Sequence, residues 1–150
     1  MKMQKYAKFF YLFLVLCLCY GCDGRVLAPT PIDTAVAHRD DAQKIATAFR
    51  NHQSNLVVES KGQVVKILPD DLKGSRHQQF VLQLAQGQTI LIAHNMDIAP
   101  RINQLAVGDE VYFSGEYEWN RQGGVVHWTH HDPEYRRFGG WLEHKGVRYE

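Results

Sequence analysis

Residues 110–133 read EVYFSGEYEWNRQGGVVHWTHHDP, and this stretch decides the fold of the chain. Its first ten residues place large apolar side chains on one face of a strand, which predicts a half-buried β-strand. Gly115 interrupts that face and indicates a β-bulge or the corner of a barrel. Residues 120–124 predict a hairpin loop, so residues 125–129 form the next strand. The stretch ends in two histidines, an aspartate and a proline.

Upstream, short apolar runs between turn signals predict the other strands of a small β domain. Residues 57–58 and 64–68 are two such runs. Residues 80–84 alternate in the manner of a half-buried strand, and residues 89–93 form another strand after a Gln-Gly-Gln turn. Residues 100–105, in which two apolar residues stand three apart, predict a short helix.

Five strands, with a short helix between the third and fourth and a glycine inside the fourth, resemble the oligonucleotide/oligosaccharide-binding (OB) fold. The sequence therefore predicts a mainly β domain over residues 56–150, a small five-stranded OB-like barrel with a C-terminal extension. The fold resemblance implies the neighbour order 1-2-3-5-4-1, with strands 3 and 5 parallel. The aromatic segment at residues 135–149 is expected to pack against the barrel.

Ahead of the barrel, residues 34–55 predict an N-terminal helix. Its apolar positions recur at the spacing of one helical face, and they are Ala42, Ile45, Ala46 and Phe49. Residues 23–33 contain Pro29 and Pro31 and few large apolar side chains, so they predict a tether.

Residues 1–22 have the composition of a signal peptide. Three lysines precede an apolar run at residues 9–20, which is too short to span a bilayer as a helix. Gly21 then precedes Cys22, an arrangement that resembles a bacterial lipoprotein signal with Cys22 as the lipidated residue. We therefore expect an exported, periplasmic protein held to the membrane through Cys22. Ordinary signal cleavage and an uncleaved anchor are the alternatives.

Charge and cysteine content narrow the function classes. The chain has 17 basic and 16 acidic residues, and the leader holds three of the bases and no acid, so residues 23–150 carry 14 − 16 = −2. Such a domain has no overall attraction to nucleic acid. All three cysteines lie in the leader, which leaves the domain without a disulfide, a thiolate zinc site or a cysteine nucleophile.

The amino-acid sequences of several segments resemble those of one bacterial family, the domain of unknown function numbered 3465. The segments that carry the resemblance are residues 65–71, 74–80, 92–97, 115–120, 123–133 and 139–141. It covers residues 57–149 and implies an exported domain with a compact β fold. It implies no catalytic residue, because the family has no established activity.

The implied strand order brings polar residues from distant segments to one rim of the barrel. The candidate ligand or metal-binding residues are His77, His94, Asp97, His127, His130, His131 and Asp132. All of them except His127, which precedes the rim on the last strand, are expected at this rim, together with Asp70, Asp71 and Asp109. Imidazole and carboxylate groups suit a divalent transition metal such as zinc. Strand alternation puts His127, Thr129 and His131 on one face and His130 on the other, so all three histidines bind one ion only if the strand ends or bends by residue 130.

Two other interpretations of the rim stay open. In the first, the histidines and aspartates are structural residues that hold loops and turns by hydrogen bonds. In the second, a histidine acts as a general base oriented by Asp70 or Asp97.

The favoured function is a module of the cell envelope that binds a ligand or a partner: an envelope protein, a glycan or a small molecule. Nucleic acid is the less favoured ligand. The alternative is a metal-dependent hydrolase or nuclease-like enzyme on an OB-type barrel, with Asp70, Asp71 and Asp97 as metal ligands and Arg76 and Arg101 as phosphate-binding groups.

Overall fold

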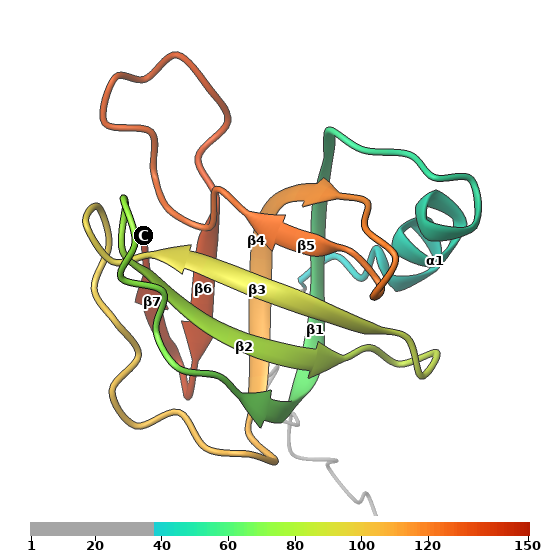
Figure 1. Ribbon diagram of the computed structural model, residues 1–150, viewed down its shortest axis with the longest axis horizontal. Helices are drawn as coiled ribbons and strands as arrows, with labels where there is room; N and C mark the ends of the chain where they lie inside the picture. Colours follow the sequence, from blue (N-terminus) through green and yellow to red (C-terminus); the bar gives the residue numbers. More distant parts are fainter. Residues whose placement is uncertain (1–37) are drawn as a thin grey trace, which may run out of the picture. The chain divides into compact units, whose positions relative to one another are not determined.

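A computed structural model of the chain describes residues 38–150, in which five strands close into a barrel (Figure 1). The neighbours run β1-β2-β3-β5-β4, β4 pairs back with β1, and β3 and β5 are parallel. The predicted OB-like barrel and its strand order are therefore confirmed. The elements are α1 (Ala42–Arg50), β1 (Leu56–Ile67), β2 (His77–Gln83), β3 (Thr89–Asn95), β4 (Glu110–Glu118), β5 (Val125–His127), β6 (Trp141–His144) and β7 (Val147–Tyr149).

Strand β1 closes the barrel because it is long enough to pair with two strands. Its first part pairs with β4 and its last part with β2. At the crossing point, a Cβ on Gly62 would lie 2.8 Å from the carbonyl oxygen of Gln83, so a side chain there would push β1 and β2 apart. The two runs predicted separately at residues 57–58 and 64–68 are one continuous strand, with a register shift between Val64 and Lys66.

Gly115 lies where β4 changes its second neighbour. Ser114 pairs with Trp141 of β6, whereas Glu116 pairs with His127 of β5. The register with β1 is continuous through this point, so β4 carries no bulge at Gly115. A Cβ on Gly115 would lie 2.5 Å from the carbonyl oxygen of His127, and its absence lets β5 approach β4 closely.

Helix α1 packs its apolar face into the barrel core, on the side away from the β3–β4 loop (Figure 1). Its buried residues are Ala42, Ile45 and Ala48. The helix is shorter than the predicted span of residues 34–55, since residues 38–41 and 51–55 are not helical. At its C-terminal end His52 adopts a positive φ of 54°, which an α-helix cannot continue.

The helix predicted at residues 100–105 is wrong, because the loop between β3 and β4 contains no helix. Gln78, a buried residue of β2, binds the backbone of Ile102 from both sides. Its Oε1 accepts from the Ile102 N–H at 2.9 Å and its Nε2 donates to the Ile102 carbonyl at 3.0 Å. Those two backbone groups are therefore not available for helical hydrogen bonds, and Ile102 itself is fully buried in the core.

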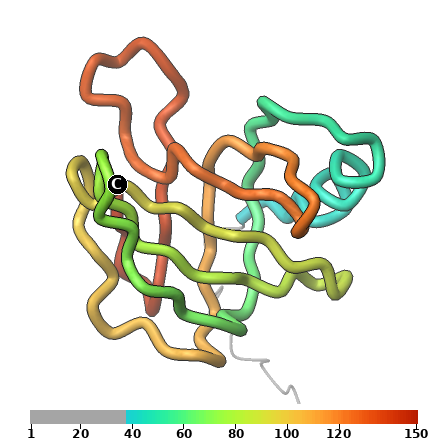
Figure 2. Tube along the Cα trace, in the orientation of Figure 1, coloured from blue at the N-terminus to red at the C-terminus, as the bar shows by residue number. Residues whose placement is uncertain are grey.

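The C-terminal extension adds to the sheet as a hairpin. β6 pairs with the first half of β4, and β7 pairs with β6. Residues 128–140, between β5 and β6, project away from the strands as a loop (Figure 2). The base of this loop is fastened by the Gly140 N–H, which donates to the His130 carbonyl at 2.9 Å.

Some predictions fall on residues 1–37, which lie outside the described residues. They are the signal peptide at residues 1–22, the lipidated Cys22, the tether at residues 23–33 and the first positions of the predicted helix. Within residues 38–150, no helix has the length and apolar character that crossing a bilayer requires.

Candidate functional site

His94 stands at the centre of the predicted rim and is fully buried. Its Nε2 lies 3.1 Å from the Pro100 carbonyl oxygen, and its Nδ1 lies 2.9 Å from the Thr129 hydroxyl. A carbonyl only accepts, so Nε2 carries the proton and Nδ1 accepts from the hydroxyl. Both ring nitrogens are engaged, and His94 ties β3 to the β3–β4 loop and to the end of β5.

Burial sets the protonation of the rim histidines. It lowers the pKa of His94 from 6.5 to about 4, and repulsion from the nearby His130 and His77 adds to the effect. Burial also lowers the pKa of His130, whose Nδ1 donates to the His131 carbonyl at 2.7 Å. His94 is therefore neutral at pH 7. The rim histidines also differ in burial, because the side chain of His94 is buried and that of His131 is exposed.

The rim aspartates are occupied by backbone groups. Asp132 accepts from the N–H groups of Glu134, Arg136 and Arg137 at 3.0, 2.8 and 2.8 Å, and these bonds lower the pKa of its carboxyl. Because Asp132 and its three backbone partners all belong to the projecting loop at residues 128–140, these hydrogen bonds stabilise the conformation of that loop. Asp109 accepts from the Ala106 N–H, which is the main reason why its pKa is lowered.

Four of the five groups that a nuclease-like centre would use neutralise one another in two ion pairs, and the fifth, Asp71, accepts from a backbone N–H. Asp97 accepts from the backbone N–H and from Nε of Arg76, at 2.8 and 2.6 Å, and these bonds lower its pKa. Asp70 pairs with Arg101 at 3.0 Å. Asp71 accepts from a turn N–H, that of Lys73. Nδ1 of His77 donates to the Ser75 carbonyl at 2.7 Å. In the described part of the chain, these groups hold turns and loops.

His127 lies apart from the rim, on the outer face of the barrel. It pairs across the ladder with Glu116, and Glu118 follows two residues later on the same face of β4. One potential ligand atom from each of the three residues lies within 4.8 Å of the others; among residues 38–150 no group of rim residues meets that criterion. Sequence reasoning named His127 but missed both glutamates. The alternation Glu-Tyr-Glu around the inward Tyr117 is the signal that identifies them.

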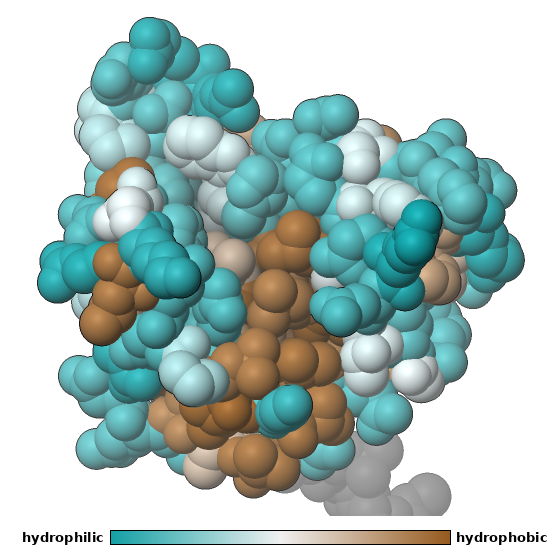
Figure 3. Space-filling model, in the orientation of Figure 1, coloured by the Kyte–Doolittle hydropathy of each residue, from teal (hydrophilic) through white to brown (hydrophobic). Residues whose placement is uncertain are grey.

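A strip of aliphatic side chains crosses the same outer face. Cross-strand pairing places Val81 beside Leu91, and Leu91 beside Val125. Figure 3 shows the strip as a continuous apolar band over β5, β3, β2 and the end of β1. We define the aliphatic strip as Val65, Ile67, Val81, Leu91, Ala93 and Val125, all of which are at least partly exposed.

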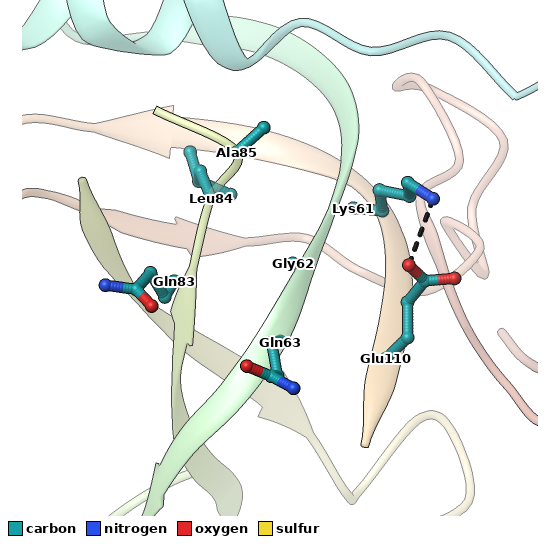
Figure 4. A pocket seen from close by; sticks show the side chains of 7 residues that line it. All are labelled: Lys61, Gly62, Gln63, Gln83, Leu84, Ala85 and Glu110. Atoms are coloured by element: carbon teal, nitrogen blue, oxygen red, sulfur yellow. Dashed lines mark ion pairs between the residues drawn. The ribbon is translucent and has the colours of Figure 1, made fainter. Parts of the chain in front are cut away.

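A cavity of about 280 Å³ lies where β1 leaves β4 for β2, beside Gly62 (Figure 4). It is bordered by the ion pair of Lys61 and Glu110, whose nitrogen and oxygen are 3.0 Å apart. Both side chains are exposed, and the remaining lining groups are glutamine, leucine and alanine. The cavity is slightly smaller than typical ligand pockets, and its two ionisable lining groups, Lys61 and Glu110, are engaged with each other.

A family model described as "Protein of unknown function (DUF3465)" matches residues 26–150, which include all the strands of the barrel and the C-terminal hairpin. The chain belongs to this family. The match confirms the resemblance drawn from the sequence segments. A comparison with curated proteins found no match. The DUF3465 description assigns no activity, so the function has to be argued from the surfaces of the barrel.

Proposed function

We propose that this domain is a binding module whose aliphatic strip receives an apolar segment of a partner protein. The carrying observation is the row of Val81, Leu91 and Val125, which are lateral neighbours on three adjacent strands and face outward. A continuous apolar surface that is exposed to solvent costs solvation free energy, and such surfaces mark interaction sites in proteins. The barrel has its core on the other side of these strands, so the strip contributes little to the fold.

The chemistry of the strip favours a protein over a glycan or a nucleic acid. Sugars and bases are bound by stacking on aromatic rings, and the strip contains aliphatic groups only. Two large aromatics of the barrel are engaged elsewhere. Trp119 donates to the Phe49 carbonyl at the end of α1, and the Tyr112 ring packs on His38 at 4.5 Å between centroids. Glu116 and Glu118, which lie on β4 beside the β5 end of the strip, also disfavour a polyanion.

The proposal is tested with peptides selected by display on the full chain in a mild detergent. We expect selected peptides with alternating apolar residues, and affinity lowered roughly 10- to 100-fold by Leu91→Glu, since one buried aliphatic side chain contributes about 1.5–3 kcal/mol. Val107→Glu is the matched control, because Val107 is 64% exposed in the loop before β4, outside the strip. Equal loss in both variants contradicts the proposal. The proposal is also contradicted if the chain binds lipid vesicles and this binding is abolished by Leu91→Glu but not by Val107→Glu, because that result assigns the strip to a membrane.

We further propose that the module acts in the bacterial cell envelope, anchored through a lipid on Cys22. The support is the leader sequence: lysines, a short apolar run, and Gly21 before Cys22. Labelled palmitate should enter the wild-type chain and a Cys19→Ser control but not Cys22→Ser. Labelling of the Cys22→Ser chain would refute the anchor.

A further inference from the structure

We infer that Glu116, Glu118 and His127 form a binding site for a divalent transition-metal ion on the outer face of β4 and β5. The site follows from the strand register. Glu116 and Glu118 are two residues apart and so point the same way from β4, and His127 is the cross-strand partner of Glu116. All three are half-buried, and their ligand atoms are within 4.8 Å of one another.

The imidazole of His127 is not committed to any other role. Its Nε2 is buried and has no hydrogen-bond partner. An unpaired buried polar atom costs free energy and calls for an explanation. The fully buried histidines of residues 38–150 each have at least one hydrogen-bond partner, and they are His94, His130 and His144. A metal ion beside the ring would use the lone pair of a neutral imidazole and remove this cost.

The two carboxylates place negative charge together with little compensation. The nearest cation in the described part of the chain is Arg137, whose Nη1 is 3.8 Å from Glu116 Oε2 and whose side chain is 57% exposed. No lysine or arginine nitrogen of residues 38–150 lies within 4.0 Å of a Glu118 oxygen. Two carboxylates on one strand face repel each other unless a cation lies between them.

The donor set selects the class of ion. One imidazole and two carboxylates suit zinc, manganese or iron(II), whereas calcium requires six or more oxygens. Ligands of a tetrahedral zinc ion lie about 3.4 Å apart for bonds near 2.1 Å. Since the ligand atoms are at most 4.8 Å apart, they need to close by no more than about 1.4 Å, which side-chain rotation of the two glutamates supplies. Three protein ligands leave at least one position for water or for a group of a partner.

The test is calorimetric titration of the full chain in mild detergent with zinc chloride, after removal of metals by chelation. We expect one zinc ion per chain and affinity at least tenfold weaker in Glu118→Gln and His127→Gln. X-ray absorption at the zinc edge should show nitrogen and oxygen donors, with the nitrogen signal lost in His127→Gln. Glu118→Gln keeps the test valid if the histidine variant does not fold.

Two controls separate this site from others. Glu110→Gln makes the same change at the far end of β4, and His131→Gln removes an exposed histidine of the rim. Both should bind zinc like the wild type. Absence of stoichiometric zinc, or equal loss in all four variants, overturns the site. The zinc titration and the peptide assay test different surfaces. Leu91→Glu changes the aliphatic strip and should leave zinc affinity unchanged, so failure of one proposal can be told from failure of the other.

Discussion

At the residue scale, the buried neutral His94 makes the stability of the barrel depend on pH. An unfolded histidine takes up a proton below its ordinary pKa of about 6.5, whereas folded His94 does so only near its pKa of about 4. The free energy of unfolding is therefore greatest above pH 6.5 and falls as the pH drops from about 6.5 to about 4. One such group contributes a slope of roughly 1.4 kcal/mol per pH unit, and His130, whose pKa is also lowered, acts in the same direction.

The pH effect is measured by urea unfolding at several pH values within that interval. His94→Gln should reduce the slope of stability against pH by about 1 kcal/mol per unit, whatever its effect on stability at neutral pH. His131→Gln, which changes an exposed side chain, should keep the wild-type slope. An unchanged slope in His94→Gln would show that another group governs the acid sensitivity.

At the element scale, a single buried side chain replaces the helix expected between β3 and β4. Gln78→Leu keeps the volume of the side chain but leaves the N–H and the carbonyl of Ile102 without partners. We expect a loss of about 1–3 kcal/mol in stability and faster amide exchange in residues 96–109. Gln79→Leu, on the neighbouring half-buried position, is the control. Equal exchange in the two variants would mean that the loop is held by other contacts.

The elements that sequence reasoning identified are those with a local signal. Strand β2 shows an alternating pattern over several residues, and β3 is a short apolar run that follows a turn, and each of these local signals is enough to predict a strand. The hairpin of β6 and β7 was not predicted as strands, because its strands have four and three residues and depend on pairing with β4. The prediction of a helix in the β3–β4 loop was also wrong because of a non-local contact: the loop is held by Gln78, which is far from Ile102 in the sequence.

At the scale of the whole molecule, the barrel topology was predictable and its polar surfaces were only partly so. Strand order correctly placed His94 beside the end of β5, where it binds Thr129. The alternation that put His127 and Thr129 on one face fails, because Trp128 has a positive φ of 53° and β5 ends at His127. Thr129 is therefore buried while His127 remains on the outer face. A backbone reversal of this kind depends on the packing of the loop and is not visible in residue types.

The whole described domain should unfold as one cooperative unit, because both of its additions share the barrel core. Helix α1 contributes Ile45 to that core and β6 contributes Leu142, each fully buried. Trp119 reports on the helix, since its indole N–H donates to the Phe49 carbonyl, and Trp141 reports on β6.

Two variants test this, each keeping one of these tryptophans and replacing the other two tryptophans by phenylalanine. Within each variant, urea unfolding followed by fluorescence and by far-UV circular dichroism should give one midpoint. An earlier fluorescence transition of Trp141 would make the C-terminal hairpin a separate unit that frays from β4. In that case the edge of β4 at residues 111–114 would be exposed before the barrel opens, and the hairpin would be a cover for that edge, not a part of the core.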